Sequence, residues 1–419
     1  RICMERERTP HAWMSLLCAR AELALEKGDD LAAAELARQG LEFDPDAPRL
    51  QAIQARLLIK QGQLKTAEEV YDKLEESIAG YEAFEIETVH DFFGDEMVLY
   101  WQRDQYLWLA QAAFDLCLWD QALRFFELTS TRHAENGYVM LQYAKALVMG
   151  AAKRRLFDEV GCVSHSPGQE SLSKETFAKL EKALASAWQI SNSKEVKRWH
   201  ARGHLAFDLT PQSIEALDKL SDALDDKAAI VAALRQLKNP KLALDVALRL
   251  PEKADYLIQR ALCYRGNDAG VGLEYARQAV EDRPADPIYN AVVALLAQEA
   301  GFVEQALGAL ETALRSWGNE SEWHASAARL ALEIGMVEES LYHWKQAFSL
   351  QPTKVEYGLA LGEAYLEHNE PEKAIQALRN ASQISVDQAN IWLLLSEAYQ
   401  RIGDSSQALE CARMADQLD

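Results

Sequence analysis

The sequence predicts an all-α fold, a solenoid in which antiparallel helical hairpins stack along one axis. Residues 253–419 carry a pattern that recurs every 34 residues through five consecutive units. Each unit has small residues at two fixed positions, where two helices can approach closely, and glycine or asparagine where the chain must turn. A looser form of the pattern continues toward the N-terminus, so the whole chain amounts to about eleven hairpins. Because each hairpin contacts only its neighbours, all 419 residues can belong to one array.

The five regular units in residues 253–419 are defined by the same positions. They begin at Lys253, Pro287, Ser321, Val355 and Ala389. The turn is expected at the fifteenth position: Asn267, Gly301, Gly335, Asn369 and Gly403. Close helix contact is expected at the twentieth: Gly272, Ala306, Ser340, Ala374 and Ala408. The twenty-seventh position is also a contact position and is alanine throughout: Ala279, Ala313, Ala347, Ala381 and Ala415.

The clearest units read Leu361-Gly362-x2-Tyr365…Ala374 and Trp392-x2-Leu395-x3-Tyr399…Ala408. They resemble the tetratricopeptide repeat, whose pattern W-x2-L-G-x2-Y…A-x3-F…A…P has the same period. The resemblance implies a right-handed superhelix in which the first helix of each hairpin lines a concave groove. In this family the groove is lined chiefly by positions two, five, nine, twelve and thirteen. The resemblance identifies a scaffold fold and no particular partner.

Residues 1–252 are expected to form a separate region of irregular repeats, with insertions at 82–102 and 150–173. Helical units are expected at these places: Met14–Ala47, Pro48–Tyr81, from Arg103 onward, Gly137–Met149 with Lys174–Ile190, Trp199 to Gly203 followed by Pro211, and Ala228–Leu237 with Lys241–Leu250. The second insertion holds the run Lys153-Arg154-Arg155, followed by glycines, serines and a proline. It is therefore predicted to be a loop and the first place that a protease cuts.

Composition and charge limit the expected cellular location of the protein and the class of its partner. The formal net charge is −21, which disfavours nucleic acid as the main ligand because phosphate binding needs clustered Lys and Arg. No apolar run approaches the ~18 residues of a membrane span, and the N-terminal residues do not form a signal peptide. The six cysteines lack metal-binding spacing, so we expect reduced thiols in a cytoplasmic protein without membrane contact.

Motifs that would indicate catalysis are almost absent, and neither enzymatic activity nor a cofactor is expected. The sequence contains no phosphate-binding loop, no nucleophile elbow and no HExxH motif. Cys162 and His165 could pair as thiol and imidazole, but no third orienting group accompanies them. One weak metal candidate is His200, His204 and Asp208, which follow one another at helical spacing on the expected groove face. The simpler interpretation is that the two histidines bind no metal and face water or a bound peptide in the groove.

The expected groove is acidic toward the C-terminus. Residues 253–419 hold 25 acidic and 13 basic side chains, and a concave acidic surface attracts basic ligands. The earlier repeats offer Arg49, Arg56 and Lys60 on the same surface. No unit has the Lys and Asn with which one tetratricopeptide subgroup binds chaperone C-termini. The residues predicted to contact a partner are Glu299, Glu322, Arg329, Glu333, Glu356, Leu359, Glu363, Glu367, Leu393, Glu397 and Arg401.

Three functions are compatible with these observations. The first is a non-catalytic scaffold that binds a peptide or protein segment, basic where it meets the C-terminal groove. The second is a regulatory or sensor arm of a larger effector, such as a signalling ATPase, a protease or a transcription regulator. It is suggested by a chain that starts without Met and ends within a repeat. The third is a metal-dependent enzyme. The sequence leaves the partner, pathway, oligomeric state and organism open.

Overall fold

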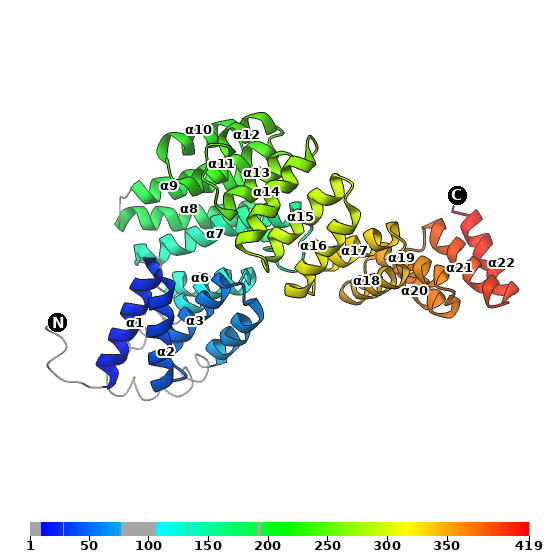
Figure 1. The fold of residues 1–419 in the computed structure, drawn as a ribbon, viewed down its shortest axis with the longest axis horizontal. Helices are drawn as coiled ribbons and strands as arrows, with labels where there is room; N and C mark the ends of the chain where they lie inside the picture. Colours follow the sequence, from blue (N-terminus) through cyan, green and yellow to red (C-terminus); the bar gives the residue numbers. More distant parts are fainter. Residues whose placement is uncertain (1–9, 28, 77–105, 133, 191–193, 419) are drawn as a thin grey trace. The chain divides into compact units, whose positions relative to one another are not determined.

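The structure is a computed structural model whose described part comprises all residues except 1–9, 28, 77–105, 133, 191–193 and 419 (Figure 1). Every regular element within the described part is a helix, as the sequence predicts. The contacts divide the chain into two units. The N-terminal unit comprises Arg1–Arg155 and His165–Asn239, and the C-terminal unit comprises Leu156–Ser164 and Pro240–Asp419. The predicted border between residues 252 and 253 concerns repeat regularity and stays a prediction.

The N-terminal unit consists of helices of unequal length. Its elements are α1 (Pro10–Glu26), α2 (Asp30–Phe43), α3 (Pro48–Lys60), helices at 64–76 and 106–115, α6 (Trp119–Arg132), most of α7 (Gly137–Glu159), the short 3-10 helix η2 (Gln169–Leu172), α8 (Lys174–Ile190), α9 (Lys194–Phe207), α10 (Pro211–Leu220) and α11 (Leu224–Gln236). The predicted helix at Lys174–Ile190 and the predicted start at Pro211 are both confirmed. The insertion expected at 82–102 lies outside the described residues.

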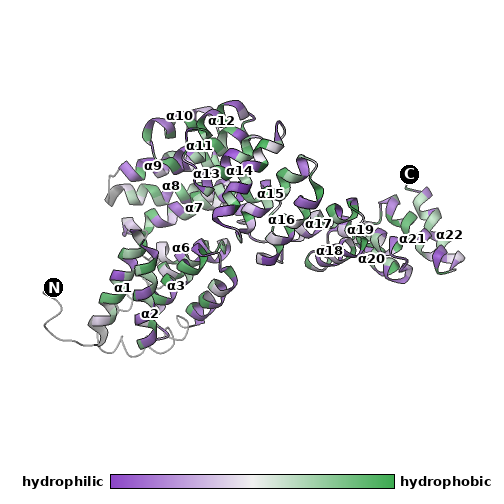
Figure 2. Cartoon of the chain, viewed as in Figure 1, coloured by the Kyte–Doolittle hydropathy of each residue, from purple (hydrophilic) through white to green (hydrophobic). Residues whose placement is uncertain are grey.

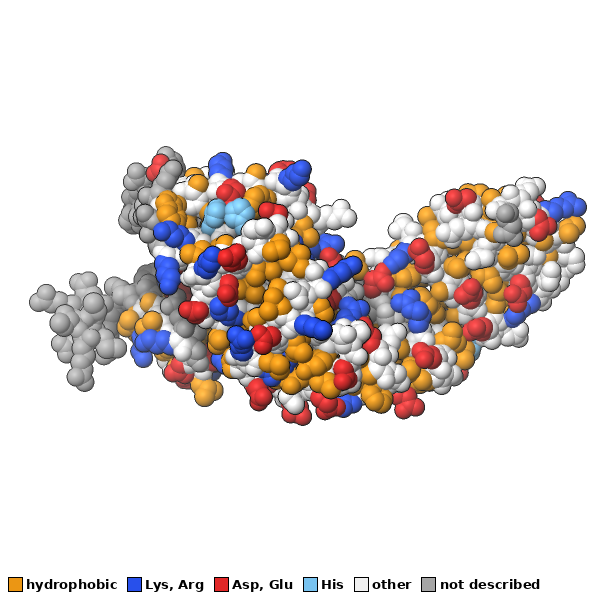
Figure 3. Space-filling view, turned by 90° about the horizontal axis from the view of Figure 1, so that it is seen from above, with side chains coloured by type: hydrophobic (Ala, Val, Ile, Leu, Met, Phe, Trp, Pro, Cys, Tyr) orange, Lys and Arg blue, Asp and Glu red, His pale blue; other side chains and the backbone are white. Residues whose placement is uncertain are grey.

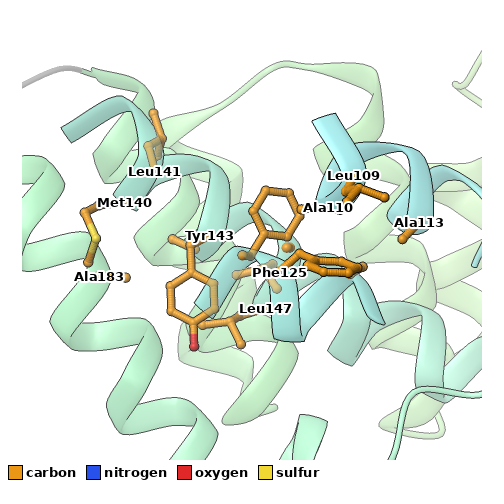
Figure 4. Close-up of a cluster of buried hydrophobic side chains, with 14 of the residues drawn as sticks. Leu109, Ala110, Ala113, Phe125, Met140, Leu141, Tyr143, Leu147 and Ala183 are labelled. Carbon is orange, nitrogen blue, oxygen red and sulfur yellow. The ribbon is translucent and has the colours of Figure 1, made fainter. Parts of the chain in front are cut away.

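The core of this unit is built from alanines that let helices approach and large side chains that fill the space between them. Figure 4 shows Leu109, Ala110 and Ala113 lying close to Phe125, with Tyr143 and Leu147 beside them. All six side chains are at most 6% exposed, so each removes most of its apolar surface from water. In Figure 2, hydrophobic and hydrophilic residues alternate around the helices, so that a helix has one hydrophobic and one hydrophilic face.

The prediction that residues 150–173 form a loop is wrong for the first part of that segment. Helix α7 continues through Glu159, and the basic run that we expected proteases to cut lies within it. Arg154 donates to the carbonyl oxygen of Pro167 at 2.6 Å, and Arg155 donates to Gln236 at 2.9 Å. The sequence interpretation failed because it stopped the helix at Gly150, which α7 tolerates next to good helix formers.

The C-terminal unit contains regular hairpins. Its helices are α12 (Pro240–Ala247), α13 (Ala254–Cys263), α14 (Ala269–Asp282), α15 (Pro287–Glu299), α16 (Val303–Ser316), α17 (Ser321–Glu333), α18 (Val337–Leu350), α19 (Val355–Glu367), α20 (Pro371–Ile384), α21 (Ala389–Arg401) and α22 (Ser405–Asp416). From α13 onward each consecutive pair forms one predicted unit, and neighbouring first helices such as α19 and α21 also contact one another.

The turns and contacts of these hairpins have the predicted geometry. Gly301, Gly335, Asn369 and Gly403 have φ of 80°, 79°, 57° and 84°, the left-handed region that glycine and asparagine adopt most easily. In the first unit the left-handed residue is Gly266, one position before the predicted Asn267. All five alanines at position twenty-seven are at most 1% exposed. These observations confirm the predicted all-α array of helical hairpins.

One segment that is distant in sequence completes the C-terminal unit. Residues 156–164, which we call the strap, lie against the start of α17. Trp323 donates its Nε1–H to the carbonyl oxygen of Val160 at 2.8 Å. The fully buried carboxylate of Glu320 accepts the backbone N–H groups of Val163 and Ser164 at 2.7 and 2.9 Å. Such charge-assisted bonds are stronger than neutral ones, so the strap is held firmly.

Two further expectations concern thiols and membranes. The cysteines that the structure describes, Cys18, Cys117, Cys162, Cys263 and Cys411, are all free, and Cys3 lies outside the described residues. Cys162 belongs to the strap and donates its thiol to Glu320 at 3.2 Å. Among the described helices, none combines the length and apolar character needed to cross a membrane.

Candidate functional site

Three of the seven glutamates that we predicted in the groove are paired with cations. Glu299 accepts from Arg265 at 2.7 Å, and Glu322 accepts from Lys354. Glu397 accepts from Arg401, itself one of the predicted contact residues, at 2.6 Å. Their charges are therefore largely offset within the protein. Arg329, the remaining predicted cation, lies over the ring of Trp344 with its guanidinium carbon 5.9 Å from the ring centroid.

The predicted glutamates without a cation within the described residues are Glu333, Glu356, Glu363 and Glu367. Three of them project from α19, and all four are exposed. Burial, and then the carboxylate of Glu367, raise the pKa of Glu363. A raised carboxylate pKa means that the folded protein disfavours the negative charge of Glu363, because burial removes part of its water and Glu367 repels it.

Apolar side chains accompany these carboxylates. Leu359 is half-buried on α19, and Leu393 on the neighbouring first helix α21 is 48% exposed. Glu356, Glu363, Glu367, Leu359 and Leu393 together are called the α19 surface below. On the face drawn in Figure 3, acidic and hydrophobic side chains are interspersed over the C-terminal unit. The C-terminal unit thus presents negative charge and apolar surface side by side.

The basic residues predicted in the N-terminal groove do not form an open cationic surface. Arg49 pairs with Glu22, Arg56 with Asp115, and Lys60 with Asp30 at 2.6 Å. Each positive charge therefore has an acidic partner in the same unit. The sequence could not show this, because the pairs join residues from different helices.

A second candidate site lies between α8, α9 and α10 of the N-terminal unit. These helices enclose a pocket of about 850 Å³ with walls that include Leu184, Trp188 and Leu220. His200 and His204 of α9 line the same pocket, and their ring centroids are 4.7 Å apart. Figure 3 shows histidine side chains together at the surface, with hydrophobic and acidic groups nearby.

Helix α9 is fixed by a buried ionic network on the face opposite its histidines. The carboxylate of Asp226, which is fully buried, accepts from Arg198, from Arg202 at 3.2 Å and from Ser221 at 2.5 Å. Residues two apart on a helix lie about 200° apart around its axis. Anchoring α9 through Arg198 and Arg202 therefore turns His200 and His204 toward α8.

A glycine brings α8 close to these histidines. A Cβ atom at Gly203 would lie only 2.6 Å from Cδ2 of Leu180, so with a larger residue either the Leu180 side chain or the helices would have to shift. The next residue on α8, Glu181, consequently lies against α9. Its Oε1 is 3.3 Å from Nε2 of His200 and 3.9 Å from Nε2 of His204.

The carboxylate that lies with the two histidines is Glu181, and Asp208, the third residue of the weak metal candidate, is not part of this cluster. Helix α9 ends at Phe207, and Asp208 lies beyond it at the pocket rim. The ligand atoms of Glu181, His200 and His204 all lie within 4.8 Å of one another. Helical spacing along one segment indicated the two histidines and missed the carboxylate of the adjacent helix.

Several solved structures resemble parts of this chain. YrrB, described as a TPR protein with an unusual peptide-binding site, is 15% identical over 40% of this chain and 87% of its own, with a TM-score of 0.38. A structure of MamA is 15% identical over 36% and 88%, with a TM-score of 0.34. Residues 41 to the end of MamA from Desulfovibrio magneticus RS-1 are 18% identical over 47% and 97%, with a TM-score of 0.35. No family model and no curated protein matches the sequence.

The fold assignment therefore depends on the hairpins of the chain itself. These hairpins have the 34-residue period of the tetratricopeptide repeat, which the sequence resembles. They also have left-handed turns and small residues at the helix contacts. The chain has a tetratricopeptide-like fold. Within this tetratricopeptide-like solenoid, the α19 surface can attract cations, and the pocket beside α9 presents imidazole and carboxylate groups.

Proposed function

We propose that the protein is a non-catalytic scaffold that binds a basic segment of a partner protein at the α19 surface. The observation that carries this proposal is the exposed row of Glu356, Glu363 and Glu367 on one helix without an ion-pairing cation in the described residues. Like charges held one turn apart repel one another, and a Lys or Arg from a partner would relieve that repulsion.

The apolar part of the α19 surface defines the partner further. Leu393 is exposed and Leu359 is half-buried, so a partner segment can remove their surface from water. The complementary segment would carry one apolar side chain flanked by Lys or Arg. Its charges would mainly set the association rate, and its apolar side chain would mainly set the lifetime of the complex.

A defined peptide panel tests this function. Peptides of one length would combine a leucine or phenylalanine with Lys and Arg, and matched peptides would carry Glu in place of the basic residues. We expect the 419-residue chain to bind the basic peptides, with affinity that falls as salt rises. Replacing Glu363→Lys and Glu367→Lys together should weaken binding by about 10-fold or more, mainly through slower association.

The control reverses two glutamates on a second helix. Glu338→Lys with Glu339→Lys on α18 changes the net charge by the same amount and alters exposed side chains outside the α19 surface. Binding should be nearly unchanged in this variant. Equal losses in both variants would show that only the overall charge matters. A panel in which no basic peptide binds would reject the proposed function.

A further inference from the structure

The cluster of Glu181, His200 and His204 offers ligands for a metal ion. Glu181 lies on α8 and is separated from His200 by 19 residues, yet its Oε2 is 3.4 Å from Nε2 of that ring. Both histidines present Nε2 toward the same carboxylate, at 3.3 and 3.9 Å from Oε1. Adjacent ligand atoms around a tetrahedral zinc ion with bonds of ~2.1 Å are about 3.4 Å apart. The cluster thus needs only small movements to surround an ion.

The carboxylate oxygen that lies near both rings is enclosed and has no hydrogen-bond donor among the described residues. Glu181 Oε1 is shielded from solvent, and within the described part of the chain it accepts no hydrogen bond, although the ring nitrogens are near. An enclosed acceptor without a partner is costly, since it has lost its water and gained nothing in return. A divalent cation at this point would bind that oxygen and the lone pairs of both imidazoles at once.

Aromatic side chains pack against members of the pocket wall. The ring of Phe177 packs edge-on against His204 with centroids 5.3 Å apart. Lys197, which also lines the pocket, has its ammonium group over the ring of Trp188 at 5.1 Å from its centroid. Aromatic packing that fixes a ligand ring reduces the ordering needed when the metal binds.

We propose that Glu181, His200 and His204 form a binding site for a divalent transition-metal ion, with Zn²⁺ as the expected occupant. Imidazole nitrogen is a borderline ligand and carboxylate oxygen a hard one, and zinc accepts both in four-coordinate sites. Three protein ligands leave one position for a water molecule, which would face the 850 Å³ pocket. This site belongs to the N-terminal unit and is independent of the proposed peptide binding at the α19 surface.

The test measures Zn²⁺ binding to the full chain by competition with a chromophoric chelator, after removal of any metal from the purified protein. We expect one site with a dissociation constant of about 1 µM or tighter. The variant His200→Asn with His204→Asn should lose it, and Glu181→Gln should weaken it by about 100-fold. Circular dichroism should show unchanged helix content in each variant, because all three side chains are partly exposed.

Asp208→Asn provides the matched control, because Asp208 lies on the same pocket rim but outside the ligand cluster. It should bind Zn²⁺ as the unaltered chain does. Replacing Zn²⁺ by Co²⁺ gives a second readout, a visible spectrum that changes when a coordinating side chain is removed. Unchanged affinity in the double histidine variant or in Glu181→Gln would overturn the proposal, as would loss of binding in Asp208→Asn.

Discussion

Helices α8–α11 and helices α17–α22 are held together by different kinds of buried residue. In α17–α22, the buried polar side chains within the helices are Ser321, His324, Ser340, His343 and Ser396, and the contacts are made by alanines at fixed positions. In α8–α11, the period is lost and the buried groups include Arg202 and Asp226, which are charged. The pocket and the histidine cluster occur in this second region.

The difference shows where specific chemistry can arise in a repeat fold. A regular hairpin is positioned by its neighbours, and small residues at two contact positions are sufficient. An irregular hairpin lacks these regularly spaced contact positions. In the N-terminal unit, the ionic contacts of Asp226 fix α9 instead. Polar networks specify orientation because each group must find its partner. The irregular region can therefore hold side chains in a defined array, whereas the regular repeats present an extended surface.

The largest effect is expected from removing the buried carboxylate of α11. Asp226→Ala leaves Arg202 buried without its acidic partner, and breaking such a pair costs about 3–5 kcal/mol. Urea denaturation followed by circular dichroism, with hydrogen exchange in α9 to assign the transition, should show this loss. The control Asp222→Asn changes a fully exposed carboxylate and should alter stability by less than about 0.5 kcal/mol. Similar stabilities for the two variants would show that the network does not fix α9.

Two glycines test the small-residue contacts of the regular repeats. A Cβ at Gly362 of α19 would lie 2.5 Å from Cγ of Leu378, which is fully buried, so Gly362→Ala should be destabilising. A Cβ at Gly308 of α16 meets no atom within 4 Å, so Gly308→Ala should stabilise by up to about 1 kcal/mol through helix propensity. We expect the two variants to differ by about 2–3 kcal/mol in urea denaturation. A stabilising Gly362→Ala would contradict the close contact between Gly362 and Leu378.

Two buried histidines in the regular repeats should make the free energy of unfolding depend on pH, and this effect is expected to be of intermediate size. Nδ1 of His324 is 2.9 Å from Nδ1 of His343, and the Nε2 of His324 is 3.1 Å from the carbonyl oxygen of Gly318. Burial lowers the pKa of both rings, and burial together with His324 lowers the pKa of His343 to about 4. Between the unfolded pKa of about 6.5 and this value, the unfolded chain binds more protons than the folded one.

Stability should therefore be full above pH 6.5 and fall by about 1–2 kcal/mol as the pH drops toward 4. Urea midpoints measured across this interval would show the fall. His343→Gln removes one titrating ring, so its curve should be flatter over the same interval. An equally steep curve for this variant would assign the acid sensitivity to other groups.

The smallest expected effect compares two glutamates of neighbouring first helices. Glu363 has its pKa raised by burial and Glu367, whereas Glu397 pairs with Arg401 at 2.6 Å. At pH 7, Glu363→Gln should stabilise and Glu397→Gln should destabilise, each by less than about 0.5 kcal/mol because solvent screens both sites. Thermal denaturation of both variants in low and high salt would resolve the opposite signs. Equal signs would mean that the α19 surface carries no uncompensated charge.

The regular hairpins were predictable because a local pattern determines them. The first helices from α15 onward begin at the predicted first positions, and Gly203 with Pro211 correctly located α9 and α10. The metal candidate was only half predictable, because Glu181 meets His200 through packing of α8 on α9 and not through spacing along one helix. Likewise, no sequence periodicity connects the strap with Glu320, which lies 156 residues beyond Ser164.

The strap has a consequence for the order in which the protein is made. A ribosome releases the strap before the repeats that hold it, so Val163 and Ser164 must wait for Glu320 to emerge and fold. During that interval the two amides lack the acceptor that they have in the folded protein. For the same reason, a gene fragment that encodes Pro240–Asp419 alone would leave the indole N–H of Trp323 without its carbonyl acceptor on Val160. Any attempt to isolate the C-terminal unit has to begin upstream of Leu156 or supply the strap as a separate peptide.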